Sequence, residues 1–544
     1  MYIEMLVRTV DCLCCTAYTL RMPLRVHPDT GLSYIMPVKK ERSEGAQVKD
    51  LDERLDVEAE EEETPRKRVK HENEEERYAQ SRRCPYLDTI DRQLLDFDFE
   101  KLCSVSLSHL NVYACLVCGK YFQGRGRHSH AYTHSVQMGH HVYINLHTLK
   151  FYCLPDNYEV IDPSLEDIKY VLNPTFTLEE IAHIDQKKRV RGLDGSTYLP
   201  GLVGMNNIKA NDYMNVIFQA LAQVPPVRDY FLREENYVHI KRPPGDQSFI
   251  LVQRFGELVR KLWNPQNFKS HVSPHEMCQA VVKTSKKTFQ FTEQGNSIDF
   301  LQWLLNTLHM ALGGTKKAGS SVVYSTFRGA MRVHTRKLPP PSENEDEYRK
   351  LLQHEEFQEK TTESPFLFLT LDLPPPPLFQ DEFEKNIIPQ VPLYELLAKF
   401  DGTTQREYQT YKESFMKRFE LIQLPRFLIL CIKRFTKNNF FVEKNPTIVN
   451  FPLEIDLAEF LSSDPAIQDR HPHTTYRLMA NIVHDGKPEP GEGSYRIHVN
   501  HRGSGQWFEL QDLHVTDLLP QMITLSESFI QLYELRHDEP AQSS

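Results

Sequence analysis

The chain has 544 residues, of which 40% are hydrophobic and 25% are charged, and its formal net charge is −10 at pH 7. This length allows two or three domains with sizeable cores. The acidic balance argues against direct nucleic-acid contact. The sequence has no run of 18 apolar residues, the length that a membrane-spanning helix needs. Ten cysteines are too few for a disulfide framework, so clustered cysteines are expected to hold metal.

Residues 1–83 are predicted to form a disordered, charged N-terminal region. From about residue 38 this segment has dense mixed charge and almost no aromatic residues, so it cannot bury enough apolar surface to offset the entropy of ordering. Residues 65–70, Pro-Arg-Lys-Arg-Val-Lys, form a basic run among acidic residues. We interpret this run as a nuclear import signal, the alternative being an ordinary solvated stretch.

The next region is rich in metal-ligating side chains. Cys115 and Cys118 form a Cys-x-x-Cys pair, and the candidate ligands His130, His134 and His140 follow, all within a stretch of 26 residues. A Cys-x-x-Cys turn and histidines one helical turn apart supply the N and S ligands that zinc takes tetrahedrally. The alternative is a redox pair with scattered surface histidines. Spacing leaves open which histidines bind, and a strand-like pattern over residues 142–153 predicts a domain larger than a small DNA-reading finger.

Cys84-Pro-Tyr, the Cys-x-x-Cys pair, residues 118–126 and the run His130-Ala-Tyr-Thr-His134 resemble the zinc finger of ubiquitin-specific proteases. The resemblance implies such a finger over residues 84–181. It further implies one zinc, held by Cys115, Cys118, His134 and His140. His130 and Cys103 are left as candidates for a second site, although Tyr86 stands where a ligand of multi-zinc members would be. Lys120 at the apparent position of a tail-clamping arginine argues against binding of the ubiquitin tail.

Residues 192–537 resemble the protease domain of the same family. Residues 201–215, Gly-Leu-Val-Gly-Met-Asn-Asn-Ile-Lys-Ala-Asn-Asp-Tyr-Met-Asn, are similar to its cysteine box, which places the nucleophile at the start of a buried helix. A helix N-terminus lowers the pKa of a thiol and stabilises the thiolate. Asp212 occupies that position here. An aspartate is expected to cap the helix, predicted over residues 216–224, but a carboxylate is a poor acyl-transfer nucleophile.

Two further motifs are degenerate in the same way. Ser494 stands where the family has the histidine base in Gly-His-Tyr, and a hydroxyl cannot accept a proton at neutral pH. Gln511, followed by Asp512, stands where the family orients that histidine. Asn207 matches the position of the oxyanion donor. Cys431 lies in a continuous apolar run and is expected to be a buried core thiol.

The resemblance implies an α+β protein with a disordered arm, a zinc finger and a papain-like fold of thumb, palm and fingers. Residues 208–213 and 431–445 are most similar to an inactive branch of the family that is associated with splicing. That likeness implies a non-catalytic nuclear scaffold that contacts proteins of the spliceosomal tri-snRNP and supports its assembly or stability. The alternative is a residual deubiquitinase, with Cys278 and His275 as a hidden pair, or a ubiquitin-binding adaptor in the nucleus.

Overall fold

The computed structural model describes residues 84–186, 188–243, 245–339, 354–375, 388–410, 413–437, 442–487 and 492–536. All of them belong to one compact unit, residues 66–544. The predicted disordered region 1–83, with its basic run at residues 65–70, lies outside the described residues. Among the helices that the structure describes, none is long and apolar enough to cross a membrane.

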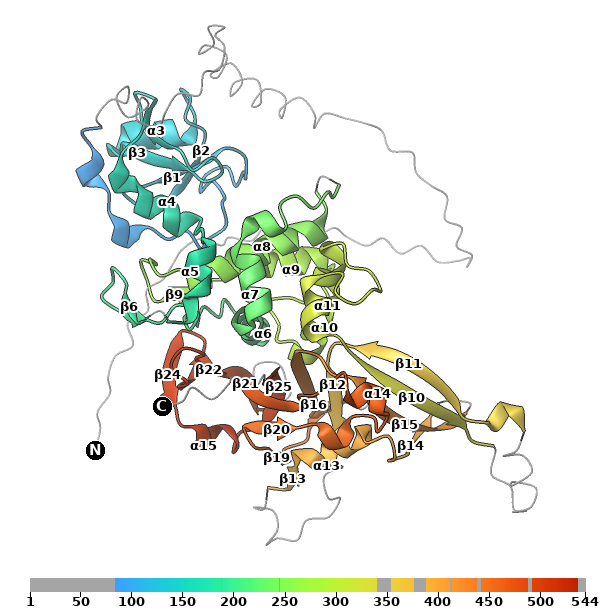
Figure 1. Ribbon diagram of the computed structural model, residues 1–544. Coiled ribbons are helices and arrows are strands. Elements are labelled where there is room, and N and C mark those ends of the chain that lie inside the picture. Colours follow the sequence, from blue (N-terminus) through green and yellow to red (C-terminus); the bar gives the residue numbers. More distant parts are fainter. Residues whose placement is uncertain are drawn as a thin grey trace, which may run out of the picture. The chain divides into compact units, whose positions relative to one another are not determined.

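The first described domain is built on a sheet in which five strands pair in the order β2-β1-β3-β4-β5 (Figure 1). All neighbouring strands are antiparallel. The predicted strand pattern over residues 142–153 is present as β3 and β4. The elements are β1 (Val112–Cys115), β2 (Tyr121–Gln123), α3 (His130–Met138), β3 (Val142–Asn145), β4 (Phe151–Cys153), β5 (Tyr158–Val160), α4 (Glu166–Leu172) and α5 (Leu178–Ala182).

A group of helices follows, centred on α6. The helices are α6 (Asp212–Gln223), α7 (Pro225–Leu232), α8 (Gln247–Trp263), α9 (His275–Thr284), α10 (Ser297–Ala311) and α11 (Val322–Phe327). The helix predicted over residues 216–224 therefore begins four residues earlier, at Asp212. Every residue of α6 is buried, which is possible because the helix carries apolar side chains around most of its circumference.

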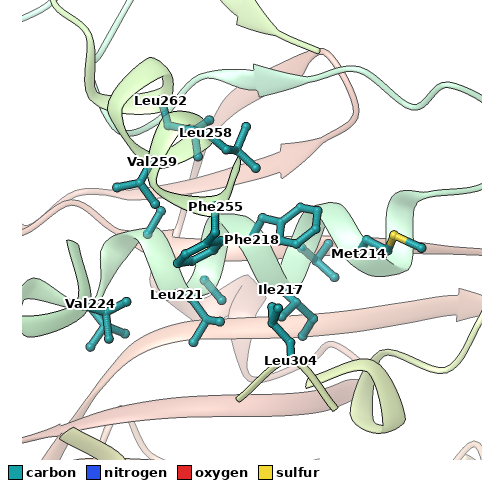
Figure 2. Packing of buried hydrophobic residues seen from close by; sticks show 14 of the residues in the cluster. Met214, Ile217, Phe218, Leu221, Val224, Phe255, Leu258, Val259, Leu262 and Leu304 are labelled. Carbon is teal, nitrogen blue, oxygen red and sulfur yellow. The ribbon is translucent and has the colours of Figure 1, made fainter. Parts of the chain in front are cut away.

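The side chains of α6 interlock with those of α8 and α10 (Figure 2). Phe218 lies between Phe255 of α8 and Phe300 of α10, with ring centroids 6.4 Å and 5.6 Å away. Full burial of one such side chain stabilises the fold by about 1.5–3 kcal/mol. The labelled residues of this core are Met214, Ile217, Phe218, Leu221, Val224, Phe255, Leu258, Val259, Leu262 and Leu304.

An eight-stranded sheet packs against α6, with strand order β12-β16-β25-β21-β22-β23-β24 and β20 pairing with β21. Its strands are β12 (Leu369–Asp372), β16 (Phe427–Lys433), β20 (Glu454–Asp456), β21 (Thr475–Gly486), β22 (Gly493–Asn500), β23 (Trp507–Gln511), β24 (His514–Leu518) and β25 (Ser528–Leu535). In β16, Ile429 and Cys431 join the core around α6, whereas Leu428 and Leu430 join a second core. Both faces of this strand are therefore covered, as its continuous apolar sequence requires.

A separate four-stranded sheet has the order β11-β10-β15-β14. Its strands are β10 (Gly329–Lys337), β11 (Lys360–Phe366), β14 (Arg406–Gln409) and β15 (Ser414–Gln423). The remaining named elements are short: β6 (Val190–Arg191), β7 (Thr197–Tyr198), β8 (Gly204–Met205), β9 (His271–Val272), β13 (Gln390–Pro392), α13 (Leu393–Leu397), β17 (Phe435–Lys437), β18 (Val442–Lys444), β19 (Ile448–Asn450), α14 (Pro465–Gln468) and α15 (Pro520–Ile523).

Buried ion pairs join the first domain to the helices. The Nζ atom of Lys261, near the end of α8, lies 3.2 Å from Asp98 Oδ1 and 3.7 Å from Glu257 Oε1. Asp98 also accepts the backbone N–H of Ser273 at 2.9 Å and pairs with Lys269 at 3.1 Å. Burial alone would lower the pKa of Lys261, but Asp98 and Glu257 outweigh it and the pKa is raised. The lysine is therefore held charged inside the interface.

We expect Lys261→Met to reduce the free energy of unfolding by about 3 kcal/mol, because the buried carboxylates of Asp98 and Glu257 lose the cation that they share. Lys269 and Arg254 stay beside them, which keeps the loss at the low end of the range for a broken buried pair. Urea denaturation measures the loss. The control is Lys283→Met on α9, where the exposed side chain should change stability by no more than about 0.5 kcal/mol. Equal, small losses in both variants would mean that the buried pairs contribute nothing to stability.

Candidate functional site

Four predicted ligands meet in the first domain. One ligand atom from each of Cys115, Cys118, His134 and His140 lies within 4.8 Å of all the others. Cys115 Sγ is 3.5 Å from His140 Nδ1, Cys118 Sγ is 3.5 Å from His134 Nε2, and the two histidine nitrogens are 3.2 Å apart. Among the described residues this is the only group of three or more such side chains close enough to hold a metal.

The separations fit a tetrahedral zinc site. Zn–S bonds of about 2.3 Å and Zn–N bonds of about 2.1 Å place two nitrogens about 3.4 Å, a sulfur and a nitrogen about 3.6 Å, and two sulfurs about 3.8 Å apart at the corners of a tetrahedron. The observed S–N distances are 3.5 Å and the N–N distance is 3.2 Å. The donor set of two sulfurs and two imidazole nitrogens is one that zinc prefers. All four ligand atoms lie within 4.8 Å of one another, so the site can accept a zinc ion with at most small movements of its ligands.

Local structure brings these ligands together. Cys115 ends β1, and the turn after Cys118 depends on Gly119, whose φ is 72°. A Cβ atom at Gly119 would lie 2.4 Å from the carbonyl oxygen of Leu94, so a side chain cannot be accommodated there. His134 lies on α3, and Gly139 ends that helix in a left-handed conformation. The chain reversal then places His140 opposite His134.

The other cysteines of this domain are used differently. The Sγ atom of Cys103 accepts the backbone N–H groups of Val105 and Ser106, at 3.5 and 3.4 Å. Cys84 and Cys153 are buried beside one another and share a neighbour in the Tyr158 hydroxyl. His130 is the first residue of α3 and lies outside the four-residue cluster.

In the basic loop after β2, the side chain of Arg125 contacts other residues of the same domain. The Arg125 guanidinium stacks over the Tyr152 ring, 4.4 Å from its centroid, and donates a hydrogen bond to Asn157 Oδ1 at 2.6 Å. Lys120 and Arg127 are exposed to solvent. Arg127 of this loop, and Lys120 just before β2, are therefore the basic side chains of this region most available to a partner.

Asp212 is the first residue of α6 and is buried, with 6% of its surface exposed. The prediction that it caps the helix is wrong, because the N-cap is Asn211, and the Asp212 carboxylate points to other elements. Its Oδ2 accepts the backbone N–H of Tyr495 at 2.9 Å and the Nε2–H of Gln294 at 2.7 Å. Burial raises the pKa of Asp212, and these two donors partly offset that effect.

The three positions that the sequence predicts to be degenerate, Asp212, Ser494 and Gln511, lie close together. Ser494 precedes Tyr495 in β22, and its Oγ lies 3.5 Å from Nε2 of Gln511 at the end of β23. The side chain of Asn207 is occupied, because its Oδ1 accepts the Asn211 N–H at 3.0 Å and its amide contacts Asp512. The arrangement holds a carboxylate, a hydroxyl and an amide together, without a nucleophile and base pair.

Gln294 is a site residue that sequence reasoning missed. It lies two residues before the α10 N-cap Asn296, and its Nε2 donates both to Asp212 and to the carbonyl oxygen of Gly493 at 3.0 Å. Its partners are 82 and 199 residues away in the chain. Neither periodicity nor local spacing could indicate contacts over such separations.

A groove of about 430 Å³ lies beside this centre. Its lining includes Gln294, Asp299 and Tyr495 together with Phe435 and His484. Burial and the nearby Lys444 ammonium lower the pKa of His484 to about 4, so its imidazole is neutral at physiological pH. The ring packs edge-on against Phe435 and Tyr495, with centroids 5.0 and 4.7 Å away. The uncharged ring of His484 therefore forms part of the groove wall together with these aromatic side chains.

Of the residues that the structure describes outside the first domain, only Cys278 and Cys431 are cysteines, and neither resembles an activated thiol. Cys278 is fully buried in α9, and burial raises its pKa to about 12. Its suggested partner His275 packs against the Phe99 ring, with centroids 5.5 Å apart. The prediction that Cys431 is a core thiol is confirmed, since it is fully buried in β16 and burial raises its pKa.

Comparison with known proteins places these features in context. Residues 203–533 match the family model for ubiquitin carboxyl-terminal hydrolase, and residues 103–165 match the zinc finger in ubiquitin-hydrolases and other proteins. The helices, the eight-stranded sheet and the four-stranded sheet are thus the predicted thumb, palm and fingers of a ubiquitin-protease fold. The chain belongs to the ubiquitin carboxyl-terminal hydrolase family.

Individual relatives cover most of the chain. The human protein named ubiquitin carboxyl-terminal hydrolase 39 is 67% identical over 461 residues, which are 84% of this chain and 81% of that protein. A protein of Schizosaccharomyces pombe, named probable mRNA-splicing protein ubp10, is 46% identical over 82% of this chain and 88% of its own length. A solved structure, described as an essential yeast splicing factor, has a TM-score of 0.65 and 29% identity, covering 83% of this chain and 100% of that one.

Proposed function

We propose that this chain is a splicing factor that acts in the nucleus as a non-catalytic scaffold on proteins of the spliceosomal tri-snRNP. The observation that carries the proposal is the match, over more than four fifths of the chain, to relatives whose names or descriptions are those of splicing proteins. Such coverage includes both the finger and the protease fold. This chain and those relatives therefore share both domains, and with them the surfaces that a scaffold offers to partner proteins.

The geometry of the cleft supports a non-catalytic role. The position that the family uses for a thiolate holds the buried Asp212, and the position of its base holds Ser494. In one serine protease, loss of either nucleophile or base alone costs about 10⁶-fold in turnover, and loss of both is little worse. A hydrogen-bonded carboxylate in place of the thiol therefore leaves no route to acyl transfer at a useful rate.

We further propose that Cys115, Cys118, His134 and His140 hold one structural zinc. Thiolate and imidazole ligands satisfy the ion fully, so the site has no open position for chemistry. The zinc would join β1, the turn after it and the end of α3, which are the elements that shape the finger.

Zinc analysis of the purified chain should find one equivalent, lost in Cys115→Ala together with the folded finger. Binding free energy at such a site is largely folding free energy, on the order of 10 kcal/mol. The matched control is Cys103→Ala, a buried cysteine of the same domain outside the cluster, which should keep its zinc. Retention of zinc by Cys115→Ala, or its loss in both variants, would refute the assignment.

A rescue experiment in cells depleted of the natural protein distinguishes a scaffold role from an enzymatic role in splicing. Asp212→Asn should restore intron removal to the wild-type level, because an amide oxygen still accepts the Tyr495 N–H while the carboxylate chemistry is gone. Lys120→Glu with Arg127→Glu should weaken co-purification with the tri-snRNP, since interface affinity rests on few contacts. Lys316→Glu with Lys317→Glu, exposed elsewhere, is the matched charge control. Failure of Asp212→Asn to rescue would reveal a chemical role for Asp212.

A further inference from the structure

Three segments far apart in the chain meet at the Asp212 carboxylate. Asp212 begins α6, Gln294 lies just before α10, and Tyr495 lies in β22, at chain separations of 82 and 283 residues from Asp212. A single oxygen, Oδ2, accepts both the Gln294 amide and the Tyr495 backbone N–H. The carboxylate thus connects the helices to the eight-stranded sheet across the cleft.

Gln294 completes the connection from the other side. Its Nε2 carries two N–H groups, and the second donates to the carbonyl oxygen of Gly493. The amide is therefore fixed by one acceptor on α6 and one on β22. Because both bonds come from the same nitrogen, Gln294 Nε2 lies between the helix and the sheet and joins them.

The groove ends at this bridge. Gln294, Gly295 and Tyr495 line it, whereas Asp212 is not among the lining residues and is only 6% exposed. A peptide lying in the groove would meet the Gln294 amide before it reached Asp212. The space in front of residue 212 is occupied by hydrogen-bonding groups of the chain itself.

We infer that Asp212 is a positioning residue, which, together with Gln294, latches α6 to β22 and seals the groove from the former reaction centre. The lost nucleophile has been replaced by a group with a structural task of its own. Asparagine would retain an acceptor for the Tyr495 N–H, but alanine would leave this buried N–H and the partly buried Gln294 amide without their shared acceptor. This inference is independent of the splicing role proposed above.

Hydrogen exchange in the full chain tests the latch. In Asp212→Ala the Tyr495 amide should exchange about 10- to 100-fold faster, equivalent to about 1.4–2.8 kcal/mol, while Asp212→Asn should stay close to the wild-type rate. The control is Asp299→Ala, an exposed carboxylate that lines the same groove and should leave exchange unchanged. Unchanged exchange in Asp212→Ala, or equal acceleration in Asp212→Asn, would overturn the inference.

A second measurement tests the seal and holds even if Asp212→Ala fails to fold. The thiol introduced by Asp212→Cys should react slowly with a small, charged methanethiosulfonate reagent, after subtraction of wild-type labelling. Adding Gln294→Ala should raise that rate at least tenfold, because it removes the amide between groove and thiol. Fast labelling without the Gln294 change, or no acceleration with it, would show that Gln294 does not close the groove.

Discussion

The complete burial of helix α6 is the constraint on which the rest of the protease fold depends. Its twelve residues are enclosed by α8 and α10 on one side and by the eight-stranded sheet on the other. Because packed interiors leave few voids, neither neighbour can move without disturbing the helix. Packing therefore fixes the body of α6 against the sheet, and the hydrogen bonds of Asp212 add to this at the helix N-terminus. The fold can thus be kept with a residue at position 212 that, as we propose, does no acyl-transfer chemistry.

Two hydrogen-bond donors explain why an aspartate is tolerated at this buried position. A buried carboxylate costs free energy unless polar groups surround it. The Tyr495 N–H and the Gln294 amide supply two donors, and the pKa of Asp212 is nevertheless raised by its burial. The same low exposure that suits a latch is unsuited to a nucleophile that a substrate must approach. The burial of residue 212 therefore both favours its role as a hydrogen-bonded latch and, in the function that we propose, makes it unfit as a nucleophile.

The sequence alone predicted more of the metal site in the first domain than of the side-chain contacts in the protease domain. A metal site was predictable from spacing, because Cys115, Cys118 and the histidines after them are close in the chain. The choice of His134 and His140 among those histidines came from the resemblance to the family's zinc finger. The identity of Asp212 was visible in its motif, but its role was not. The expected cap is absent because the carboxylate turns toward partners contributed by other elements. Contacts of that kind depend on tertiary packing, as do the ion pairs of Lys261.

The central claim is that this ubiquitin-protease fold has no nucleophile. The most direct measurement is the reaction of the purified chain with ubiquitin that carries a thiol-reactive electrophile at its C-terminus, followed by mass spectrometry. We expect no covalent adduct, because Asp212 offers no thiolate and burial raises the pKa values of Cys278 and Cys431. A stoichiometric adduct that disappears in Cys278→Ala or Cys431→Ala would contradict the account.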